Sequence, residues 1–289
     1  MSTAADRRHS VSRVLITGSA DGLGLLAARR LIAEGHHVVL HARSNARAHD
    51  ALHRAPEAVA ALIADLSLRS EVVRLANQAQ RFGPFDAVIH NAAVGPGQVR
   101  RVLTEDGVSE MLAVNVLAPY LLTALMEPPS RAIYISSALH RRGELDLSDL
   151  SWRDRAWDGR QAYADSKLLV SVLAMAVARR RPRTVVNVVE PGWVPTRMGG
   201  PAAPEDLHLG ADTQAWLAVS EDRAARISGR YLYHRAERAA HPAVGRADAQ
   251  EALLQACARL TGVSLEGGGD AAPGARRPLA MVALGGASG

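Results

Sequence analysis

Cysteine, lysine and aromatic residues are scarce in this 289-residue chain, and each scarcity excludes a class of protein. Cys257 is the only cysteine, so the chain can form no internal disulfide and no cysteine-rich metal site. Aromatic residues make up 4% of the sequence, and the basic residues are scattered rather than gathered along one stripe. We therefore expect no nucleic-acid partner, and a reducing, cytoplasmic location.

Long hydrophobic runs are missing as well. No segment approaches the ~18 consecutive apolar residues of a membrane span, and residues 1–10 are polar and charged where a secretory signal is apolar. We therefore expect no membrane partner. Residues 1–10 predict a flexible arm, and residues 266–289, rich in Gly, Ala and Pro, predict a disordered tail.

Motifs for metal binding and for hydrolysis are not found. The sequence has no H-E-x-x-H pair, and His36, His37 and His41 on one predicted strand are more typical of packing or surface residues. No G-x-S-x-G elbow occurs, so a hydrolase role for Ser137 and His140 has little support. We expect no bound metal.

Apolar residues make up 48% of the chain, and they alternate between short strand-like runs and longer segments with helical spacing. This alternation predicts right-handed crossovers and a parallel sheet covered by helices on both faces. The expected fold class is α/β, a Rossmann-type doubly wound sheet of about seven strands in a single domain, residues 11–265. The predicted strands are 13–17, 37–42, 59–64, 86–90, 131–136, 184–189 and 229–233, and the predicted helices are 23–34, 69–82, 106–126, 161–180 and 248–260.

Gly18, Gly22 and Gly24 lie where the first predicted strand turns into the first predicted helix. Glycines at such a turn let backbone N–H groups approach a pyrophosphate, whose charge then rests on the positive end of the helix. The turn therefore indicates dinucleotide binding. A merely tight strand-to-helix turn is the alternative.

Tyr163 and Lys167 are four residues apart in a predicted helix, which places both side chains on one face. A phenol has an ordinary pKa of about 10, so proton transfer near neutrality requires a lowering of that pKa by roughly three units, or about 4 kcal/mol. A neighbouring ammonium group and the positive charge of an oxidised nicotinamide have the right sign for this. Because Lys167 is the only lysine among 34 basic residues, an accidental pair on a solvated helix face is the weaker interpretation.

The glycine turn and the Tyr-x-x-x-Lys pair occur with further segments in an order that resembles the short-chain dehydrogenases/reductases, over roughly residues 11–262. The long stretch between Ser137 and Tyr163 is similar to the retinol-dehydrogenase-like branch of that family. His90 and Ala93 depart from the family's Asn-Asn-Ala-Gly segment, which bears on local backbone contacts and not on the fold. The other matching segments are Asp65-Leu66, Asn115, Ser137 and Pro191 to Thr196.

The resemblance implies that Ser137 hydrogen-bonds the substrate oxygen and that the backbone carbonyl of Asn115 holds a water near Lys167. A turn-capping hydroxyl and a surface polar position are the respective alternatives. The implied catalytic residues are Asn115, Ser137, Tyr163 and Lys167. The implied cofactor contacts are Gly18, Ser19, Gly22, Leu23, Gly24, Arg43, Asp65, Leu66, Asn91, Ala92, Tyr163, Lys167, Pro191, Gly192, Val194 and Thr196. The implied substrate contacts are Ser137, His140, Tyr163 and Trp193, with residues 138–162 and 193–228 as walls of the substrate site.

The choice of cofactor depends on the end of the second predicted strand. A carboxylate there would bind the ribose 2′-hydroxyl of NAD(H), but this chain has Ala42 followed by Arg43, whose guanidinium suits a 2′-phosphate. NADP(H) is therefore favoured over NAD(H), although Asp21 in the glycine turn argues against it. Glu190, just before Pro191, either faces the nicotinamide or, more commonly for such a residue, is an exposed loop carboxylate.

These features predict an NADP(H)-dependent oxidoreductase that moves a hydride between nicotinamide and a carbonyl or alcohol carbon, with Tyr163 as general acid/base. The expected partner is a moderately bulky, partly apolar small molecule. Two alternatives are a catalytically silent NADP(H)-binding sensor or partner-binding module, and a non-redox rearrangement or dehydration on the same fold. The resemblance also implies a homodimer or homotetramer. Substrate identity, direction and stereochemistry do not follow from the sequence.

Overall fold

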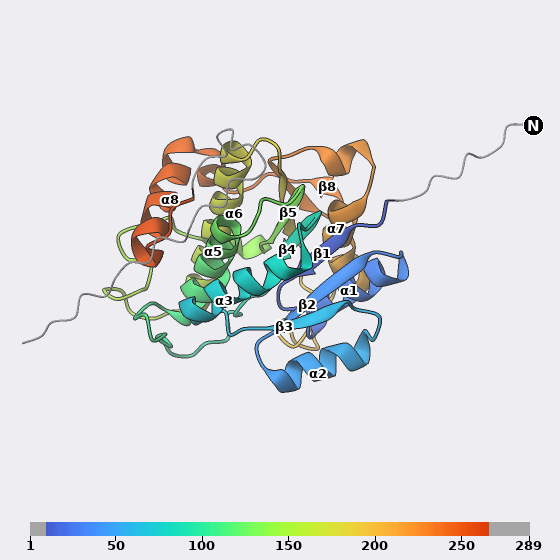
Figure 1. Cartoon of the computed structure of the whole chain (residues 1–289). Helices are drawn as coiled ribbons and strands as arrows, with labels where there is room; N and C mark the ends of the chain where they lie inside the picture. The colour runs from blue at the N-terminus through green and yellow to red at the C-terminus, as the bar shows by residue number, and fades with distance from the viewer. Residues whose placement is uncertain (1–9, 266–289) are drawn as a thin grey trace, which may run out of the picture.

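The computed structural model describes residues 10–265 of the chain. Nearly all of the expected N-terminal arm, and the whole expected tail at 266–289, lie outside the described residues. Within the described part, the expected Rossmann-type α/β sheet is confirmed, with helices on both of its faces (Figure 1).

Eight strands form one sheet in the order β3-β2-β1-β4-β5-β6-β7-β8. The first seven are parallel, and β8 pairs antiparallel with β7. The two-residue β8 was not predicted, because so short a strand carries no alternating pattern. It follows a turn in which His234 and Arg235 both have positive φ, +46° and +63°, as in the tight turns that suit hairpins. The strands are β1 Arg13–Ile16, β2 His37–Ala42, β3 Ala60–Ile63, β4 Ala87–His90, β5 Arg131–Ile135, β6 Val185–Glu190, β7 Arg230–Tyr233 and β8 Ala236–Glu237.

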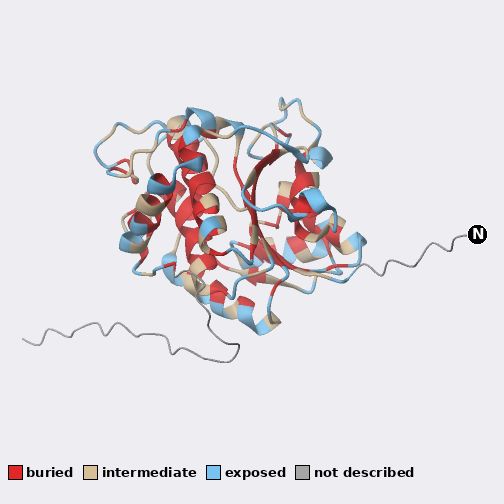
Figure 2. Ribbon diagram, turned by 90° about the horizontal axis from the view of Figure 1, so that it is seen from above, coloured by how far each residue is buried: buried red, intermediate tan, exposed pale blue. Residues whose placement is uncertain are grey.

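Two layers of helices cover the sheet, and each layer has its own apolar core. Viewed from above, buried residues fill the sheet and the inward sides of the helices next to it (Figure 2). Successive side chains of a strand point to opposite faces, so Leu15 packs in one core while Val14 and Ile16 pack in the other. One layer contains α1 Gly22–Ala33, α2 Asn45–Arg54 and α7 Leu207–Val219. The other contains α3 Arg69–Ala79, α4 Glu110–Leu112, α5 Ala118–Leu125, α6 Gly159–Arg180 and α8 Ala247–Thr261.

The predicted helix 106–126 begins a few residues later in the structure, at Glu110, and its α-helical hydrogen bonding is interrupted in the middle. Ser109 caps the first turn, α4, by accepting a hydrogen bond from the N–H of Leu112, and residues 104–108 form a turn instead. Residues Ala113–Leu117 then form a π-helical turn before α5 begins. Pro119 has no N–H to donate to the carbonyl of Asn115 four residues earlier, so the regular α-helical bond cannot form there.

The C-terminal helix packs against the long helix α6. Arg179 of α6 donates a 3.1 Å hydrogen bond to Gln250 of α8. Beyond α8, the hydroxyl of Tyr120 donates to the carbonyl oxygen of Val263 at 2.7 Å and accepts from the N–H of Leu265 at 3.2 Å. Residues 263–265 are thereby fixed on α5, which extends the core of this layer.

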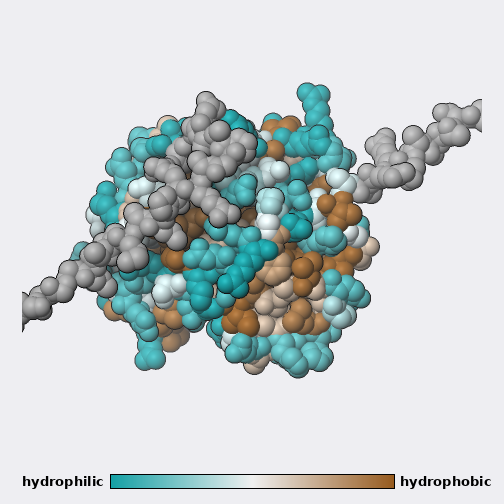
Figure 3. Space-filling model, in the orientation of Figure 1, coloured by the Kyte–Doolittle hydropathy of each residue, from teal (hydrophilic) through white to brown (hydrophobic). Residues whose placement is uncertain are grey.

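The surface in Figure 3 is mostly hydrophilic, with apolar side chains gathered over the β2–β3 end of the sheet. Val59, next to the edge strand β3, is among the exposed large apolar residues. Among residues 10–265, no helix has the length and apolar character needed to cross a membrane.

Candidate active site

The carboxyl ends of β1, β4, β5 and β6 bring the sequence motifs to one edge of the sheet. The glycine turn follows β1, Asn91 follows β4, Ser137 follows β5 two residues on, and Pro191 follows β6. In an open parallel sheet this edge is where ligands bind, because the loops there diverge to opposite faces. The long helix α6 adds Tyr163 and Lys167 from one side.

The glycine turn is held by close packing against the segment after β4. A Cβ atom on Gly18 would lie 2.7 Å from Cα of Ala92, and one on Gly24 would lie 2.5 Å from Nδ2 of Asn91. Gly18 also has a φ of +63°, a conformation that residues with a Cβ rarely adopt. Asn91 Nδ2 donates to the carbonyl oxygens of Thr17 at 2.9 Å and of Gly18 at 3.1 Å. Asn91 and Ala92 therefore shape the turn.

His41 fixes the same turn from the other side. Its Nδ1 accepts a hydrogen bond from the N–H of Gly18 at 2.9 Å, and its Nε2 lies 3.0 Å from the carbonyl oxygen of Ala64. Nε2 therefore carries the proton, and burial lowers the pKa of His41 to about 4. A packing or surface role was expected for His41, and its bond to the glycine turn was not predicted. A polar residue within a buried strand is the sequence signal that could have drawn attention to it.

The N-terminus of α1 has backbone N–H groups free for an anionic ligand. Asp21 caps the helix by accepting from the N–H of Gly22 at 2.8 Å, while the amides of Leu23 and Gly24 have no acceptor inside the helix. Burial acts to raise the pKa of Asp21, but the bonds from Gly22, Arg54 and Arg47 outweigh it and lower the pKa. The donor set fits a pyrophosphate.

Arginines surround this capping carboxylate. Arg47 and Arg54 each place a guanidinium nitrogen 3.3 Å from an oxygen of Asp21. Arg43 is exposed at the end of β2, and within residues 10–265 its side chain makes no hydrogen bond or ion pair. The charge of Asp21 is thus compensated by Arg47 and Arg54, while Arg43 remains available to bind an anionic ligand.

Asp65 and Leu66, two further implied cofactor contacts, follow β3. Asp65 accepts hydrogen bonds from the backbone N–H and the hydroxyl of Ser67, at 2.9 and 2.7 Å, so its side chain caps a turn. Leu66 is buried in the core beside α3. These contacts hold the β3–α3 loop at the same edge of the sheet.

Tyr163 and Lys167 lie together and are both buried. Lys167 Nζ is 5.5 Å from the centre of the Tyr163 ring and donates to the carbonyl oxygen of Ile135 at 3.0 Å. Burial raises the pKa of Tyr163 to about 12, partly offset by a hydrogen bond with Ser137, and burial lowers the pKa of Lys167 to about 7. The residues of the protein alone therefore do not make this phenol acidic, and the expectation for the pair also included the positive charge of the oxidised cofactor.

Ser137, rather than its neighbour Ser136, faces Tyr163. The hydroxyl of Ser136 donates to the carbonyl oxygen of Lys167 at 3.1 Å and accepts from Ser171 at 2.9 Å, so it is used inside the protein. Ser137 also accepts from the N–H of Leu139 at 3.3 Å. The turn-capping role raised as an alternative therefore exists alongside the contact with Tyr163.

Asn115 is buried and not at the surface. Its Oδ1 accepts from the N–H of Val94 at 2.7 Å, and its Nδ2 donates to the carbonyl oxygen of Val94 and to the hydroxyl of Ser166. The amide thus joins the loop after β4 to α6 near Tyr163. The disturbed helix at Pro119 leaves the Asn115 carbonyl without its usual helical donor.

Apolar side chains surround the phenol. Tyr163 packs in a small cluster with Met111, Trp152 and Ala162, and Val94, Leu139 and Trp157 pack against it. The hydroxyl of Tyr163 lies 3.8 Å from Sδ of Met198, which belongs to the loop after β6. Sequence reasoning missed Met198, because nothing in the local sequence indicates that this exposed residue reaches the phenol.

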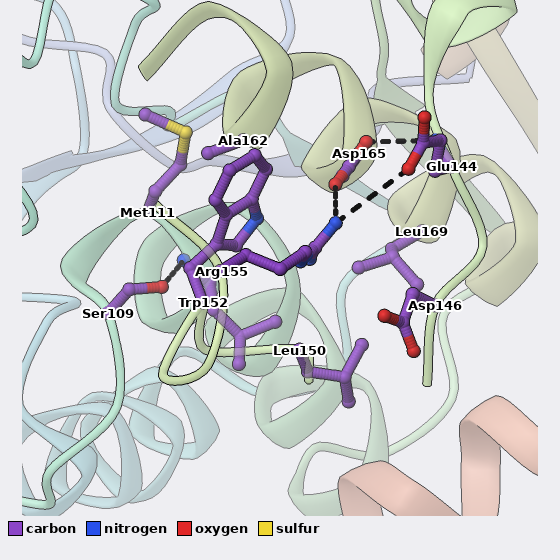
Figure 4. A pocket seen from close by; sticks show the side chains of 11 residues that line it. Ser109, Met111, Glu144, Asp146, Leu150, Trp152, Arg155, Ala162, Asp165 and Leu169 are labelled. Carbon is purple, nitrogen blue, oxygen red and sulfur yellow. Dashed lines mark hydrogen bonds and ion pairs between the residues drawn. The ribbon is translucent and has the colours of Figure 1, made fainter. Parts of the chain in front are cut away.

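A hollow on the other side of this cluster is shown in Figure 4. Trp152 forms one wall, and Arg155 lies over its ring, 4.0 Å from the centre. Arg155 also reaches Asp165 at 3.4 Å and Glu144 at 3.9 Å. These contacts tie the expected substrate wall, residues 138–162, to the helix that carries Tyr163.

The loop after β6 contacts both ends of the site. Thr196 lies against Gly22, where a Cβ would be 3.4 Å from its methyl group, and Val194 is buried. Trp193 is 55% exposed, and its Nε1 donates to the carbonyl oxygen of Gly199 at 2.9 Å. Pro191 and Gly192 form the start of this loop.

Glu190 is buried, so the expectation of an exposed loop carboxylate is wrong. The hydroxyl of Tyr231 donates to its Oε2 at 2.9 Å, and Arg141 lies 3.1 Å from the same oxygen. Tyr231 pairs with Val188 across β6 and β7, and this register brings its hydroxyl to Glu190. A buried carboxylate is retained here because it is paired and hydrogen-bonded.

His140 is buried behind Ser137. Its Nδ1 lies 2.7 Å from the carbonyl oxygen of Ser137, and its Nε2 accepts from the N–H of His241 at 3.1 Å. Both ring nitrogens are therefore used by backbone groups, which leaves neither for the expected substrate contact. Among the residues that the structure describes, no group of three or more His, Cys, Asp or Glu side chains is arranged to hold a metal ion.

The chain is similar to proteins of known family. The family description "short chain dehydrogenase" matches residues 12–140. Short-chain dehydrogenase chry4 of Gibberella zeae is 41% identical over 259 residues, which cover 88% of this chain and 99% of that protein. Retinol dehydrogenase 14 of Homo sapiens is 33% identical over 267 residues, which cover 76% of this chain and 77% of that protein.

Solved structures share the fold. The crystal structure of an uncharacterized protein from Mycobacterium Paratuberculosis has a TM-score of 0.75 at 24% identity, covering 88% of this chain and 94% of that one. A blue fluorescent protein from a metagenomic library, crystallised with NADPH, has a TM-score of 0.60 at 25% identity, covering 77% of this chain and 95% of that one. The chain is an oxidoreductase of the short-chain dehydrogenase/reductase family, in its retinol-dehydrogenase-like branch.

Proposed function

We propose that this protein uses NADP(H) to interconvert a carbonyl group and an alcohol on an apolar, moderately bulky small molecule, with Tyr163 as the acid/base. The observation that carries the proposal is the meeting of Tyr163, Lys167 and Ser137 at the sheet edge that also holds the glycine turn. A protein that only senses a dinucleotide needs the glycine turn, but it has no need of a buried phenol and ammonium beside it.

Each side chain has a distinct task in the reductive direction. Ser137 donates a hydrogen bond to the substrate carbonyl oxygen, and Tyr163 Oη gives that oxygen its proton as the carbon is reduced. The cofactor, when bound, supplies the hydride. Lys167, held by the Ile135 carbonyl, lies beside the phenol, and in its charged form it would favour the phenolate that remains.

Asn115 supports the return of the proton. Its buried amide fixes Val94 and Ser166, and its carbonyl lacks the regular helical donor because Pro119 follows four residues later. We assign that carbonyl the task of holding a water through which Lys167 and Tyr163 regain a proton. The oxidative direction uses the same groups in reverse.

The arginines at the end of β2 support the preference for NADP(H). Arg43 is exposed and unengaged within the described residues, and Arg47 lies one helical turn further at the start of α2. A guanidinium suits a phosphate better than it suits a ribose hydroxyl. The objection from Asp21 loses weight, because Arg47 and Arg54 already compensate its charge.

The surroundings of Tyr163 indicate an apolar substrate. Trp152, Trp157, Met111 and Leu139 lie in or against the cluster that contains the phenol, and Met198 touches its hydroxyl. Such walls favour an apolar ketone or aldehyde over an anionic one, since a carboxylate placed there would lose its hydration without gaining a partner.

Loss of NADPH absorbance with a panel of apolar ketones and aldehydes tests the proposal. Tyr163→Phe should lower turnover by at least a hundredfold, the usual contribution of a general acid. Tyr120→Phe removes a hydroxyl that bonds to Val263 and Leu265 and not to the site residues, and it should retain turnover. Undiminished turnover in Tyr163→Phe would refute the role of the phenol.

The two alternatives predict different behaviour of the cofactor. A silent sensor would bind NADPH and never consume it with any carbonyl compound, whereas a rearrangement or dehydration would convert substrate while the oxidation state of the cofactor stays constant. Retention of both Tyr163 and Lys167 in contact argues against the sensor.

A homodimer or homotetramer and a cytoplasmic location remain predictions. Because α8 packs against α6 and Tyr120 of α5 is bonded to Val263, association through α5 and α6 would have to include the C-terminal segment or displace it. Size-exclusion chromatography with light scattering, at several protein concentrations, measures the oligomeric state.

A further inference from the structure

The loop between β6 and α7 is closed at its base by a reciprocal pair of hydrogen bonds. The N–H of Trp193 donates to Oε1 of Glu205 at 2.7 Å, and the N–H of Glu205 donates to the carbonyl oxygen of Trp193 at 3.1 Å. Two residues that are twelve positions apart are therefore held together by both the side chain and the backbone of Glu205. The bond to its carboxylate is charge-assisted, the stronger kind of hydrogen bond.

The other oxygen of this carboxylate ties the loop to the sheet. The hydroxyl of Tyr233 donates to Oε2 of Glu205 at 2.7 Å, and His234 Nε2 lies 3.7 Å from the same oxygen. Tyr233 belongs to β7 and pairs in register with Glu190, the last residue of β6. Glu205 thus connects the start of the loop with the strand beside it.

The carboxylate of Glu205 also lies directly against Gly192. A Cβ on Gly192 would lie 2.0 Å from Oε2 of Glu205, and its φ of +85° disfavours any side chain. The carboxylate therefore rests directly on the backbone of Gly192. The first turn of α7 closes on the same segment, because a Cβ on Gly210 would meet the carbonyl oxygen of Pro191 at 3.0 Å.

The loop that Glu205 holds runs from the glycine turn to the phenol. Thr196 lies against Gly22 at the start of α1, and Met198 lies 3.8 Å from the hydroxyl of Tyr163. A dinucleotide with its phosphates at α1 and its redox ring at Tyr163 must pass beside this loop. Its adenosine end would lie at Arg43, beyond β2 and on the far side of the glycine turn from Glu205.

We propose that Glu205, through Trp193 and Tyr233, is a positioning residue that sets the affinity of the protein for the nicotinamide half of NADP(H). It does so by fixing the backbone of residues 191–194, the segment that the resemblance assigns to the cofactor. Glu205 touches neither the cofactor nor the substrate. The proposal rests on the proposed function, and it adds a residue that the glycine turn and the Tyr-x-x-x-Lys pair do not include.

The test compares a whole cofactor with half of one. Isothermal titration calorimetry measures the dissociation constants of NADPH and of 2′,5′-ADP, which lacks the nicotinamide half, for the unaltered protein and for Glu205→Gln. In Glu205→Gln the dissociation constant of NADPH should rise about tenfold, which corresponds to the loss of one charge-assisted hydrogen bond. The dissociation constant of 2′,5′-ADP should stay within about twofold of its value in the unaltered protein. General damage to the fold would weaken the binding of both ligands equally, and that result would overturn the proposal.

Two further variants sharpen the comparison. Tyr233→Phe keeps the hydrogen bond from Trp193 to Glu205 but removes the hydrogen bond that anchors Glu205 to β7. The dissociation constant of NADPH should therefore rise by a smaller factor than in Glu205→Gln, about threefold, and that of 2′,5′-ADP should again be unchanged. Glu105→Gln makes the same chemical change at an exposed carboxylate and should leave both constants unchanged. Tyr233→Phe also serves if Glu205→Gln folds poorly, which its thermal melting temperature reports.

The outcomes separate this proposal from the proposed function. If the unaltered protein binds neither NADPH nor 2′,5′-ADP, both are overturned. If it binds both ligands and oxidises NADPH with a carbonyl compound, while Glu205→Gln leaves the ratio of the two constants unchanged, only the role of Glu205 is overturned.

Discussion

Lys167 Nζ lies 5.5 Å from the centre of the Tyr163 ring and donates a hydrogen bond to the carbonyl oxygen of Ile135, with both side chains buried. Burial opposes the charged form of each group, so the pKa of the lysine falls to about 7 while that of the phenol rises to about 12. The pair is therefore costly to the fold, and it is placed where a catalytic function would justify that cost.

The stability of the protein should rise with pH because of Lys167. Its pKa is about 7 in the folded chain and 10.5 ordinarily, so between these values the unfolded chain binds more protons. The full penalty therefore exists below pH 7 and disappears as the pH approaches 10. Lys167→Met should unfold with a flatter dependence on pH between 7 and 9.5, and should gain on the order of a few kcal/mol relative to the unaltered protein at pH 7.

Urea unfolding at a series of pH values measures this difference. The window ends below pH 10, because above it the buried tyrosines, whose pKa values are raised, begin to destabilise the folded chain. Equal slopes for the two proteins would show that Lys167 is not buried as described.

His41 should affect the stability of the protein at acidic pH. Burial lowers its pKa from 6.5 to about 4, so on acidification the unfolded chain takes up a proton that the folded chain resists. Its contribution to stability is complete above pH 6.5 and is lost as the pH falls to 4, by roughly 3 kcal/mol. His41→Gln should remove this part of the acid sensitivity.

His37 offers a matched control on the same strand, since it is exposed at the start of β2. His37→Gln should retain the acid sensitivity of the unaltered protein in thermal melts between pH 4 and 7. If both variants melt alike across that range, the neutral state assigned to His41 is wrong.

Much of the fold followed from the sequence because each central strand is a compact apolar run. A strand buried on both faces needs such a run, and the intervening helices show their own period, so β1 to β7 were located within a residue or two. Helix α2 was missed because its buried face consists of Ala48 and Ala51, which give little apolar signal. Its cap, Ser44, was the available cue.

The site was predicted where local motifs define it and not where distant segments meet. Tyr163, Lys167 and Ser137 come together because parallel strands end at one edge. Glu190 and His41 depend on partners in other strands, and Met198 reaches Tyr163 only through the path of a long loop. Such partners follow from the register of the sheet and the packing of loops, which no local pattern specifies.

Arg43 should decide between the two nicotinamide dinucleotides. Arg43→Leu removes the exposed cation at the end of β2, so the dissociation constant of NADPH should rise by about ten- to a hundredfold, the value of a lost charge-assisted contact with phosphate. The constant for NADH, which has no 2′-phosphate, should change by less than threefold.

Fluorescence titration with both cofactors measures the two constants, and Arg29→Leu on α1 provides a control with the same loss of charge. If Arg43→Leu weakens the binding of NADPH and NADH equally, the arginine contributes to dinucleotide binding in general and not to the choice between the two cofactors. No change in either would remove the basis for preferring NADP(H).

Gly18 and Gly35 differ in why glycine is needed: both have a positive φ, but only Gly18 also packs closely against another segment. Both have positive φ, +63° and +87°, so alanine at either site costs about 1–2 kcal/mol of backbone strain. A Cβ on Gly35 would meet nothing within 4 Å, whereas one on Gly18 would lie 2.7 Å from Cα of Ala92. Gly18→Ala must in addition push the glycine turn away from the segment after β4, because the obstacle is backbone that cannot rotate aside.

The free energy of unfolding, measured in urea, should therefore fall by at least about 1 kcal/mol more in Gly18→Ala than in Gly35→Ala, since overpacking adds to the shared strain. Binding of NADPH should be lost in Gly18→Ala and kept in Gly35→Ala, because only the first displaces the N–H groups at the start of α1. Equal destabilisation with binding intact in both would mean that Gly18 is needed only for its φ, and that the close approach to Ala92 does not shape the phosphate site.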